Sequence, residues 1–187
     1  MALCDYLLDR DILGYDCASP PVKGVYATGL LINRSDIDHW APGGIILKCG
    51  GKKAYKVVQG GKTPFNGTQQ EMQEGVYQNT LTNTLQIVVL RQDENWAEQL
   101  NALINGEFVA VLRNKAGNYQ AFGLEAGLHC TGAVRELYND DTLAGWQITF
   151  TEEGATRSLF ITGQNFSYIQ NETLPCNVSP EPYSSPT

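Results

Sequence analysis

Residues that usually carry catalysis or bind metals are scarce in this sequence. It contains only two histidines, His39 and His129, and its five cysteines include no Cys-x-x-Cys pair. An odd number of widely scattered cysteines makes a poor disulfide framework, and without Cys-x-x-Cys spacing a zinc ribbon is excluded. The sequence therefore predicts no catalytic residue, no cofactor site and no metal site, and it indicates a protein that is not an enzyme.

Positive charge and long apolar runs are also lacking. Lys and Arg total 13 against 20 Asp and Glu, which gives a net charge of −7. An acidic surface repels phosphate, so tight binding to nucleic acid or to anionic lipid is disfavoured. An acidic wall beside moving DNA remains compatible with this charge. No apolar run approaches the roughly 20 residues of a membrane span, so we expect no membrane partner.

Charged residues make up only 18% of the chain, below the roughly 25% of an average domain. Neutral polar residues are common instead, with 13 Asn, 12 Gln and 14 Thr. Such groups can pair without the desolvation cost of buried charges, so this composition suits surfaces that pack against copies of themselves. It suits a plain β protein equally well, and the composition does not separate the two.

The length of 187 residues predicts one domain with appendages. We expect an N-terminal arm at residues 1–21, a β domain at residues 22–170 and a Pro-rich C-terminal tail at residues 171–187 that is ordered only against a partner. The first 16 residues carry four Asp and one Arg, unlike the basic start of a secretory signal. The chain is therefore expected to be made and kept in a reducing cytoplasm.

Strand signals dominate between the arm and the tail. Short β-rich or apolar stretches, punctuated by pairs of glycines, predict antiparallel strands at residues 25–32, 45–48, 54–59, 85–91, 108–113, 119–124, 134–138, 146–151 and 158–161. One helix is predicted over residues 95–105. Asn95 and Glu98 form a capping-box pattern, Gly106 ends the helix, and one apolar face, packed on a sheet, is formed by Trp96, Leu100, Leu103 and Ile104.

Two motifs resemble reactive sites, and each has a simpler interpretation. Gly60-Gly61-Lys62-Thr63 follows a predicted strand but lacks the earlier glycine and the following helix of a phosphate loop, so a hairpin turn is favoured. His129 stands beside Cys130, but neighbouring residues on a strand point to opposite faces, so a Cys-His catalytic pair is disfavoured.

The acidic pairs and the tryptophans also have simpler interpretations than a cation, catalytic or sugar site. Asp36 and Asp38 could share a face and bind a cation, although a solvated loop is favoured. Asp140-Asp141 and Glu152-Glu153 could act as paired acids only if they faced each other across a substrate, which the sequence does not set, so turn residues and a solvated acidic rim are favoured. A sugar-stacking platform could be built from Trp40, Trp96 and Trp146, but the core is the favoured place for the last two.

The chain from the predicted helix onward resembles structural proteins of tailed bacteriophages, especially those of Bacteroides-type hosts. The resemblance rests on Asn95-Trp96 at the helix start, the strand 108–113 (FVAVLR), the hairpin 117–128 (GNYQAFGLEAGL) and the strand 145–151 (GWQITFT). Asp16-Cys17 through residues 22–26 (VKGVY) is similar to the start of such proteins. Of these proteins, the chain most resembles the tail tube class.

The resemblance implies an antiparallel β-sandwich or partly closed barrel with one flanking α-helix. It also implies subunits that form rings, usually hexamers, and stack into a tube by joining sheet edges and inserting arms into neighbours; residues 35–53, residues 60–84 and both termini would be those arms. The expected partners are copies of the chain, other tail or neck proteins, and genomic DNA that passes without tight binding. The expected location is the virion.

Other functions stay open. A head-tail junction ring or a capsid accessory protein belongs to the same broad kind. A carbohydrate- or receptor-binding β-sandwich module belongs to a different class, as does a small hydrolase. Glu152 and Glu153 are candidates for residues that face the channel of a tube.

Overall fold

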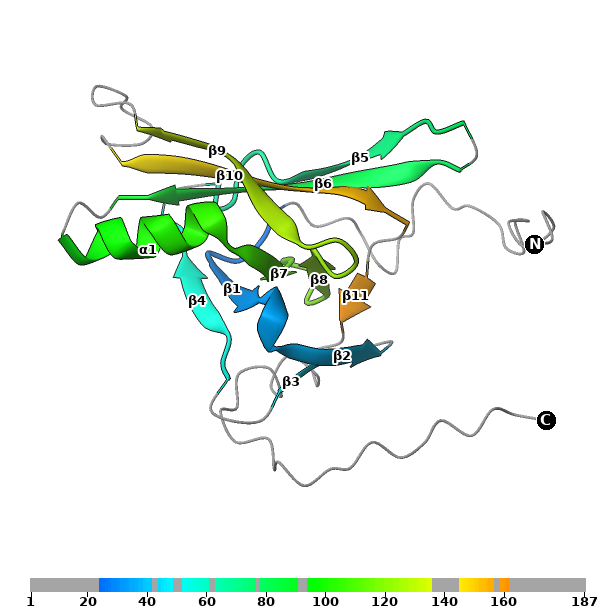
Figure 1. Cartoon of the computed structure of the whole chain (residues 1–187), viewed down its shortest axis with the longest axis horizontal. Helices are drawn as coiled ribbons and strands as arrows, with labels where there is room; N and C mark the ends of the chain where they lie inside the picture. The colour runs from blue at the N-terminus through cyan, green and yellow to red at the C-terminus, as the bar shows by residue number, and fades with distance from the viewer. Residues whose placement is uncertain are drawn as a thin grey trace.

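The computed structural model in Figure 1 describes residues 24–41, 44–48, 52–60, 63–76, 78–90, 94–135, 145–156 and 159–161. The predicted N-terminal arm at 1–21 and C-terminal tail at 171–187 lie outside the described residues. In chain order the elements are β1 (Thr28–Asn33), the 3-10 helix η1 (Arg34–Asp36), β2 (Ile37–Ala41), β3 (Gly44–Leu47), β4 (Tyr55–Val58), β5 (Gln69–Gln73), β6 (Thr80–Val89), α1 (Glu94–Asn105), β7 (Glu107–Arg113), β8 (Tyr119–Phe122), β9 (Leu128–Arg135), β10 (Trp146–Ala155) and β11 (Leu159–Ile161).

The described residues are mainly β with one α-helix, as predicted. Nine strands form one antiparallel sheet with the main order β11-β8-β7-β9-β10-β6-β5, and β1 joins it by pairing with both β7 and β4. β2 and β3 form a separate hairpin. The sheet is not closed into a barrel. It is sandwich-like, because β7 changes partners along one edge, pairing with β8 over residues 110–113 and with β9 over residues 107–108.

β7 and β1 lie in the middle of the molecule and are buried on both faces. In β7, Phe108, Ala110 and Leu112 face one hydrophobic core, while Val109 and Val111 face another. Alternate side chains of a strand point to opposite faces, so the uninterrupted apolar run FVAVL can serve two cores at once.

The first core lies between these central strands and the layer of β6, β9, β10 and α1 (Figure 1). Phe108 and Phe150 meet there edge to face, with ring centroids 5.8 Å apart. Trp96 and Leu100 of α1 are buried in this core and Leu103 is partly buried, as the helical spacing predicts; Ile104, expected on the same face, is exposed. The helix begins at Glu94, so Asn95 lies inside it and the predicted N-cap position is wrong by at least one residue.

The second core lies on the opposite face of β1 and β7, where the β2-β3 hairpin covers it (Figure 1). Ile45 and Leu47 of β3 are buried against Ile32 and Val109. The expectation that residues 35–53 form an arm that inserts into a neighbouring subunit is therefore wrong for β2 and β3, because this hairpin completes the core of its own chain.

The Gln59 side chain hydrogen-bonds to β6 where no strand pairing joins β4 to β6 in the described residues. Gln59, directly after β4, accepts a hydrogen bond from the Val88 amide (2.9 Å) and donates one to the Val88 carbonyl (3.1 Å). Its backbone amide donates to the Ala27 carbonyl. Gln59 is buried, and its amide group takes the place of one residue of a neighbouring strand.

Candidate functional site

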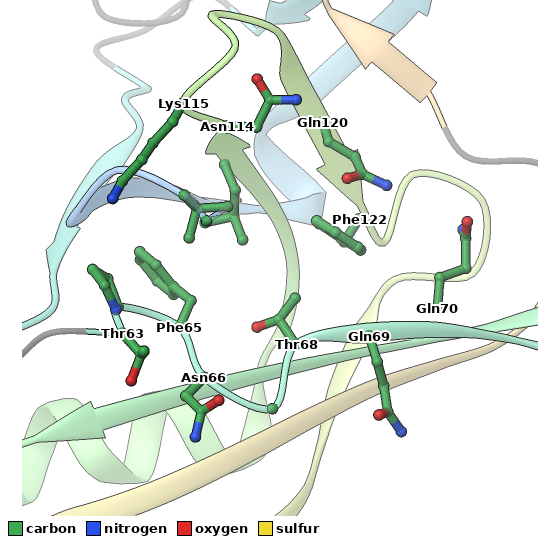
Figure 2. Close-up of a pocket in the computed structure, with 15 residues that line it drawn as sticks. Thr63, Phe65, Asn66, Thr68, Gln69, Gln70, Asn114, Lys115, Gln120 and Phe122 are labelled. Atoms are coloured by element: carbon green, nitrogen blue, oxygen red, sulfur yellow. The ribbon is translucent and has the colours of Figure 1, made fainter. Parts of the chain in front are cut away.

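A cavity of about 670 Å³ opens between two turns of the chain, and Figure 2 shows its lining. One wall is the turn at residues 63–68 that leads into β5; the other is the β7-β8 turn with the adjoining part of β8. The base consists of Phe65, Leu112 and Phe122, which all belong to the first core. The cavity therefore lies at the end of this core, where apolar packing gives way to polar side chains.

The first wall is shaped by an unusual backbone. Phe65 has a φ of 55°, in the left-handed region that bulky residues rarely adopt. Its ring lies over β1 at Gly29, where an added Cβ would come within 2.9 Å of the ring and 2.6 Å of Leu112. A side chain at position 29 would therefore clash with the Phe65 ring and with Leu112. Strained residues of this kind tend to occur at binding and catalytic sites.

The second wall is a regular hairpin turn. The Asn114 amide donates to the Asn118 carbonyl, and the Asn114 side chain accepts from the Asn118 amide, each at 2.9 Å. Gly117 completes the turn with a φ of 95°. The hairpin that the sequence predicts between residues 108–113 and 119–124 is confirmed. It places Lys115 above the cavity, and period-two alternation puts Gln120 on the same face of β8 as Phe122.

The phosphate-loop-like motif lies beside this cavity. Residues 61 and 62 lie outside the described residues, and Thr63 begins a turn that runs to Gly67. A phosphate loop needs a helix there to direct its amides and dipole at the phosphate, and the described residues form a turn instead. The predicted hairpin turn is wrong, because β4 before it pairs with β1 and β5 after it pairs with β6.

His129 and Cys130 lie on opposite faces of β9, as predicted. His129 is exposed, while Cys130 is partly buried against the first core and its thiol contacts the Gly132 carbonyl at 3.6 Å. The two side chains do not form a catalytic pair.

The expectation that Asp36 and Asp38 lie in a solvated loop is wrong. Asp36 is in η1 and is only 6% exposed; it accepts a hydrogen bond from Asn33 (2.9 Å) and pairs with Lys52 (2.9 Å). The hydrogen bond from Asn33, followed by the contact with Lys52, lowers the pKa of Asp36 below its ordinary value of 3.8. The same contact raises the pKa of Lys52. Asp38 is in β2 and contacts His39 at 2.8 Å.

The prediction that Glu152 belongs to a solvated acidic rim is wrong. It is only 1% exposed, and its two oxygens accept hydrogen bonds from the Asn83 side chain and from the backbone amides of Gly123, Glu125 and Ala126, at 2.7 to 3.0 Å. Period-two alternation along β10 places Glu152 on the same inward face as Ile148 and Phe150, a signal that the sequence carries. Glu153, the next residue, is exposed, and Asp140-Asp141 lies outside the described residues.

The backbone amides that Glu152 binds belong to the β8-β9 loop, residues 123–127, and Arg34 binds this loop as well. Its guanidinium donates to the carbonyls of Gly123 (3.4 Å), Leu124 (2.8 Å) and Glu125 (2.5 Å). The loop lies where β7 changes its partner from β8 to β9, so Arg34 and Glu152 fix the point at which the sheet divides.

The tryptophans do not form one platform. Trp96 is buried in the first core and Trp146 packs partly against it, as predicted, whereas Trp40 packs against the second core. Within the described residues, no group of three or more His, Cys, Asp or Glu side chains could hold a metal ion. The same part of the chain contains no helix with the length and apolarity needed to cross a membrane.

Three strands of the sheet have only one described neighbour. β11 pairs with β8, β4 pairs with β1, and β5 pairs with β6. At the turn of the β5-β6 hairpin, which projects from the body in Figure 1, Val76 is 94% exposed and Met72 on β5 is 65% exposed. Tyr55 and Val58 are the exposed apolar residues of β4.

Comparison with family models, with curated proteins and with solved structures yields no match for this chain.

Proposed function

We propose that this protein is a structural protein of a tailed bacteriophage virion, whose subunits assemble into stacked rings that form a tail tube or a tube-like conduit for DNA. The proposal rests on the sequence resemblance and, in the structure, chiefly on one observation. The β5-β6 hairpin projects from the body with an unpaired strand at its edge and apolar side chains near its turn. Unpaired edges and exposed apolar groups favour association with another chain.

Two of the three unpaired edges, those of β5 and β4, carry opposite charges. The hairpin has Glu71 and Glu74, and the segment leading into and along β4 has Lys53 and Lys56. An acidic edge that meets a basic edge of the next copy would use two different patches of each subunit. Contacts of that kind are head-to-tail, and they close into rings when the rotation between subunits divides a full turn.

The overall charge suits a conduit. A net charge of −7 per subunit, repeated around a ring, would repel the phosphates of DNA and let it pass without being held. Glu152 is not part of such a wall because it is buried, so Glu153 is the member of this pair that can face a channel.

The edge contact is tested by reversing its charges. We expect Glu71→Lys to lower the average mass measured by light scattering at high concentration, because it places two positive groups across the contact. Lys56→Glu should do the same, and the double variant should recover assembly. Glu98→Lys, on the exposed side of α1, is the matched control and should assemble like the unmodified protein. Equal masses for all four variants would contradict the edge contact.

A further inference from the structure

The cavity of Figure 2 has polar side chains that no other part of the described chain engages. The side chains of Lys115 and Gln120 lie at its second wall, and neither side chain has a hydrogen bond or an ion pair within the described residues. Thr68 and Asn114, by contrast, already accept backbone hydrogen bonds. The cavity thus combines a fixed framework with two polar side chains free to contact a ligand.

The charge at the cavity is opposite to that of the chain as a whole. No Asp or Glu is among the described lining residues, although acidic residues exceed basic ones by seven overall. The one charged side chain in the lining is the ammonium of Lys115. A cationic ligand would find no counter-ion here, whereas a carboxylate would.

The remaining groups are amides and hydroxyls around an apolar base. Amide side chains both donate and accept, which matches the hydroxyl groups of a sugar, since each hydroxyl also does both. Phe65, Leu112 and Phe122 offer an apolar surface for the C–H face of a sugar ring. A cavity of about 670 Å³ lies within the usual range of small-molecule sites, roughly 300–1,000 Å³.

The base of the cavity is also held in place before any ligand arrives. Phe65 keeps its left-handed backbone because its ring fills the space above Gly29, and the Thr68 amide donates to the Phe65 carbonyl at 3.2 Å. A preformed wall reduces the ordering cost of binding.

We propose that this cavity binds an acidic saccharide, a unit of one or two sugar rings that bears a carboxylate. Lys115 pairs with the carboxylate, Gln120 binds a ring hydroxyl, and the base of Phe65, Leu112 and Phe122 packs against the ring. The cavity adjoins the β5 edge, because its lining residue Gln69 donates a hydrogen bond to Glu71 at 2.8 Å. Saccharide binding and edge assembly are therefore measured separately, each with its own variants.

The test is a calorimetric titration of the full chain with the disaccharide of galacturonic acid and with the disaccharide of galactose in the same linkage. At low salt we expect the acidic disaccharide to bind about 5-fold more tightly, the size of one exposed ion pair. Lys115→Met should remove this preference. Gln120→Leu should weaken the binding of both disaccharides by about 5-fold to 10-fold, through loss of a hydrogen bond.

Lys48→Met is the matched control, because Lys48 is an exposed lysine that donates to the Ser35 carbonyl and is not in the lining. It should leave both affinities unchanged, and urea unfolding should show that all three variants are folded. The proposal is overturned if neither disaccharide binds at millimolar concentration, if the two bind equally, or if Gln120→Leu binds like the unmodified protein.

Discussion

Glu152 and Arg34 are charged side chains that bind backbone. Glu152 accepts three amide hydrogen bonds from the β8-β9 loop, and Arg34 donates to three carbonyls of the same loop. Loops usually lie in water, which satisfies their polar groups. Here the loop lies at the point where the sheet divides, so side chains take the place of that water.

Replacement of Glu152 tests this role. We expect Glu152→Gln to lower the free energy of unfolding by about 1–3 kcal/mol, because the new NH2 group would face backbone amides that also need an acceptor. Glu153→Gln, at the exposed neighbouring position, should change it by less than about 0.5 kcal/mol. Urea unfolding measures both. Similar losses for the two variants would show that the buried contacts of Glu152 contribute little.

The Asp36 carboxyl group should make the free energy of unfolding depend on pH in the acid range. Its pKa is lowered in the folded protein by the Asn33 hydrogen bond and by Lys52, so its ionised form stabilises the fold above the unfolded value of 3.8 and this contribution is lost as the pH falls through the folded value. The unmodified protein should exceed Asp36→Asn in stability by a constant amount above about pH 5 and by progressively less below pH 4. Urea unfolding of the two proteins from pH 7 to pH 2.5 measures this difference.

Asp38→Asn serves as the control for that series, because Asp38 is exposed and contacts only the half-exposed His39. Its stability should follow that of the unmodified protein through the acid range. A difference between the unmodified protein and Asp36→Asn that does not shrink in acid would contradict the role given to the ionised carboxylate.

At the scale of elements, apolar strands were predictable and polar ones were not. The predicted strands 45–48, 108–113, 119–124 and 146–151 correspond to β3, β7, β8 and β10, because each places apolar side chains in a core. β5 has the sequence QQEMQ and was missed, since an edge strand with both faces largely in water shows no apolar alternation. β2 was missed too, because its sequence IDHWA reads as a polar loop.

Boundaries failed where tertiary contacts decide them. β6 begins at Thr80, five residues before the predicted start, because β5 and β10 pair with its polar half. β9 begins at Leu128 and not at residue 134, since its first residues pair with β7 and β10. For the same reason the cavity could not be predicted from the sequence, because its walls come from residues about 50 positions apart in the chain.

The hydrogen bonds of Gln59 join β4 to β6, and their contribution can be tested. We expect Gln59→Leu to lower the free energy of unfolding by about 1–3 kcal/mol, because the partly buried amide and carbonyl of Val88 would both lose their partner. Hydrogen exchange at the Val88 amide should accelerate more than exchange across the β6-β10 pairing. Gln73→Leu, on exposed β5, is the matched control and should change neither quantity. Unchanged exchange at Val88 in Gln59→Leu would show that the junction does not depend on this side chain.

Across the whole molecule, the interior strands of the described chain are buried on both faces, whereas the strands at the ends of the sheet have one edge without a partner strand. β1 and β7 bury both faces, while β5 and β4 each keep one unpaired edge. A monomer usually protects such edges with charge, proline or a covering element. Here the charges at the two edges have opposite signs, which favours contact between copies.

Electron micrographs of concentrated, negatively stained protein test whether the unmodified full chain assembles. We expect rings of uniform diameter, with some stacked into short tubes. Micrographs that show no particle larger than a single 20.5 kDa chain at any concentration would contradict it.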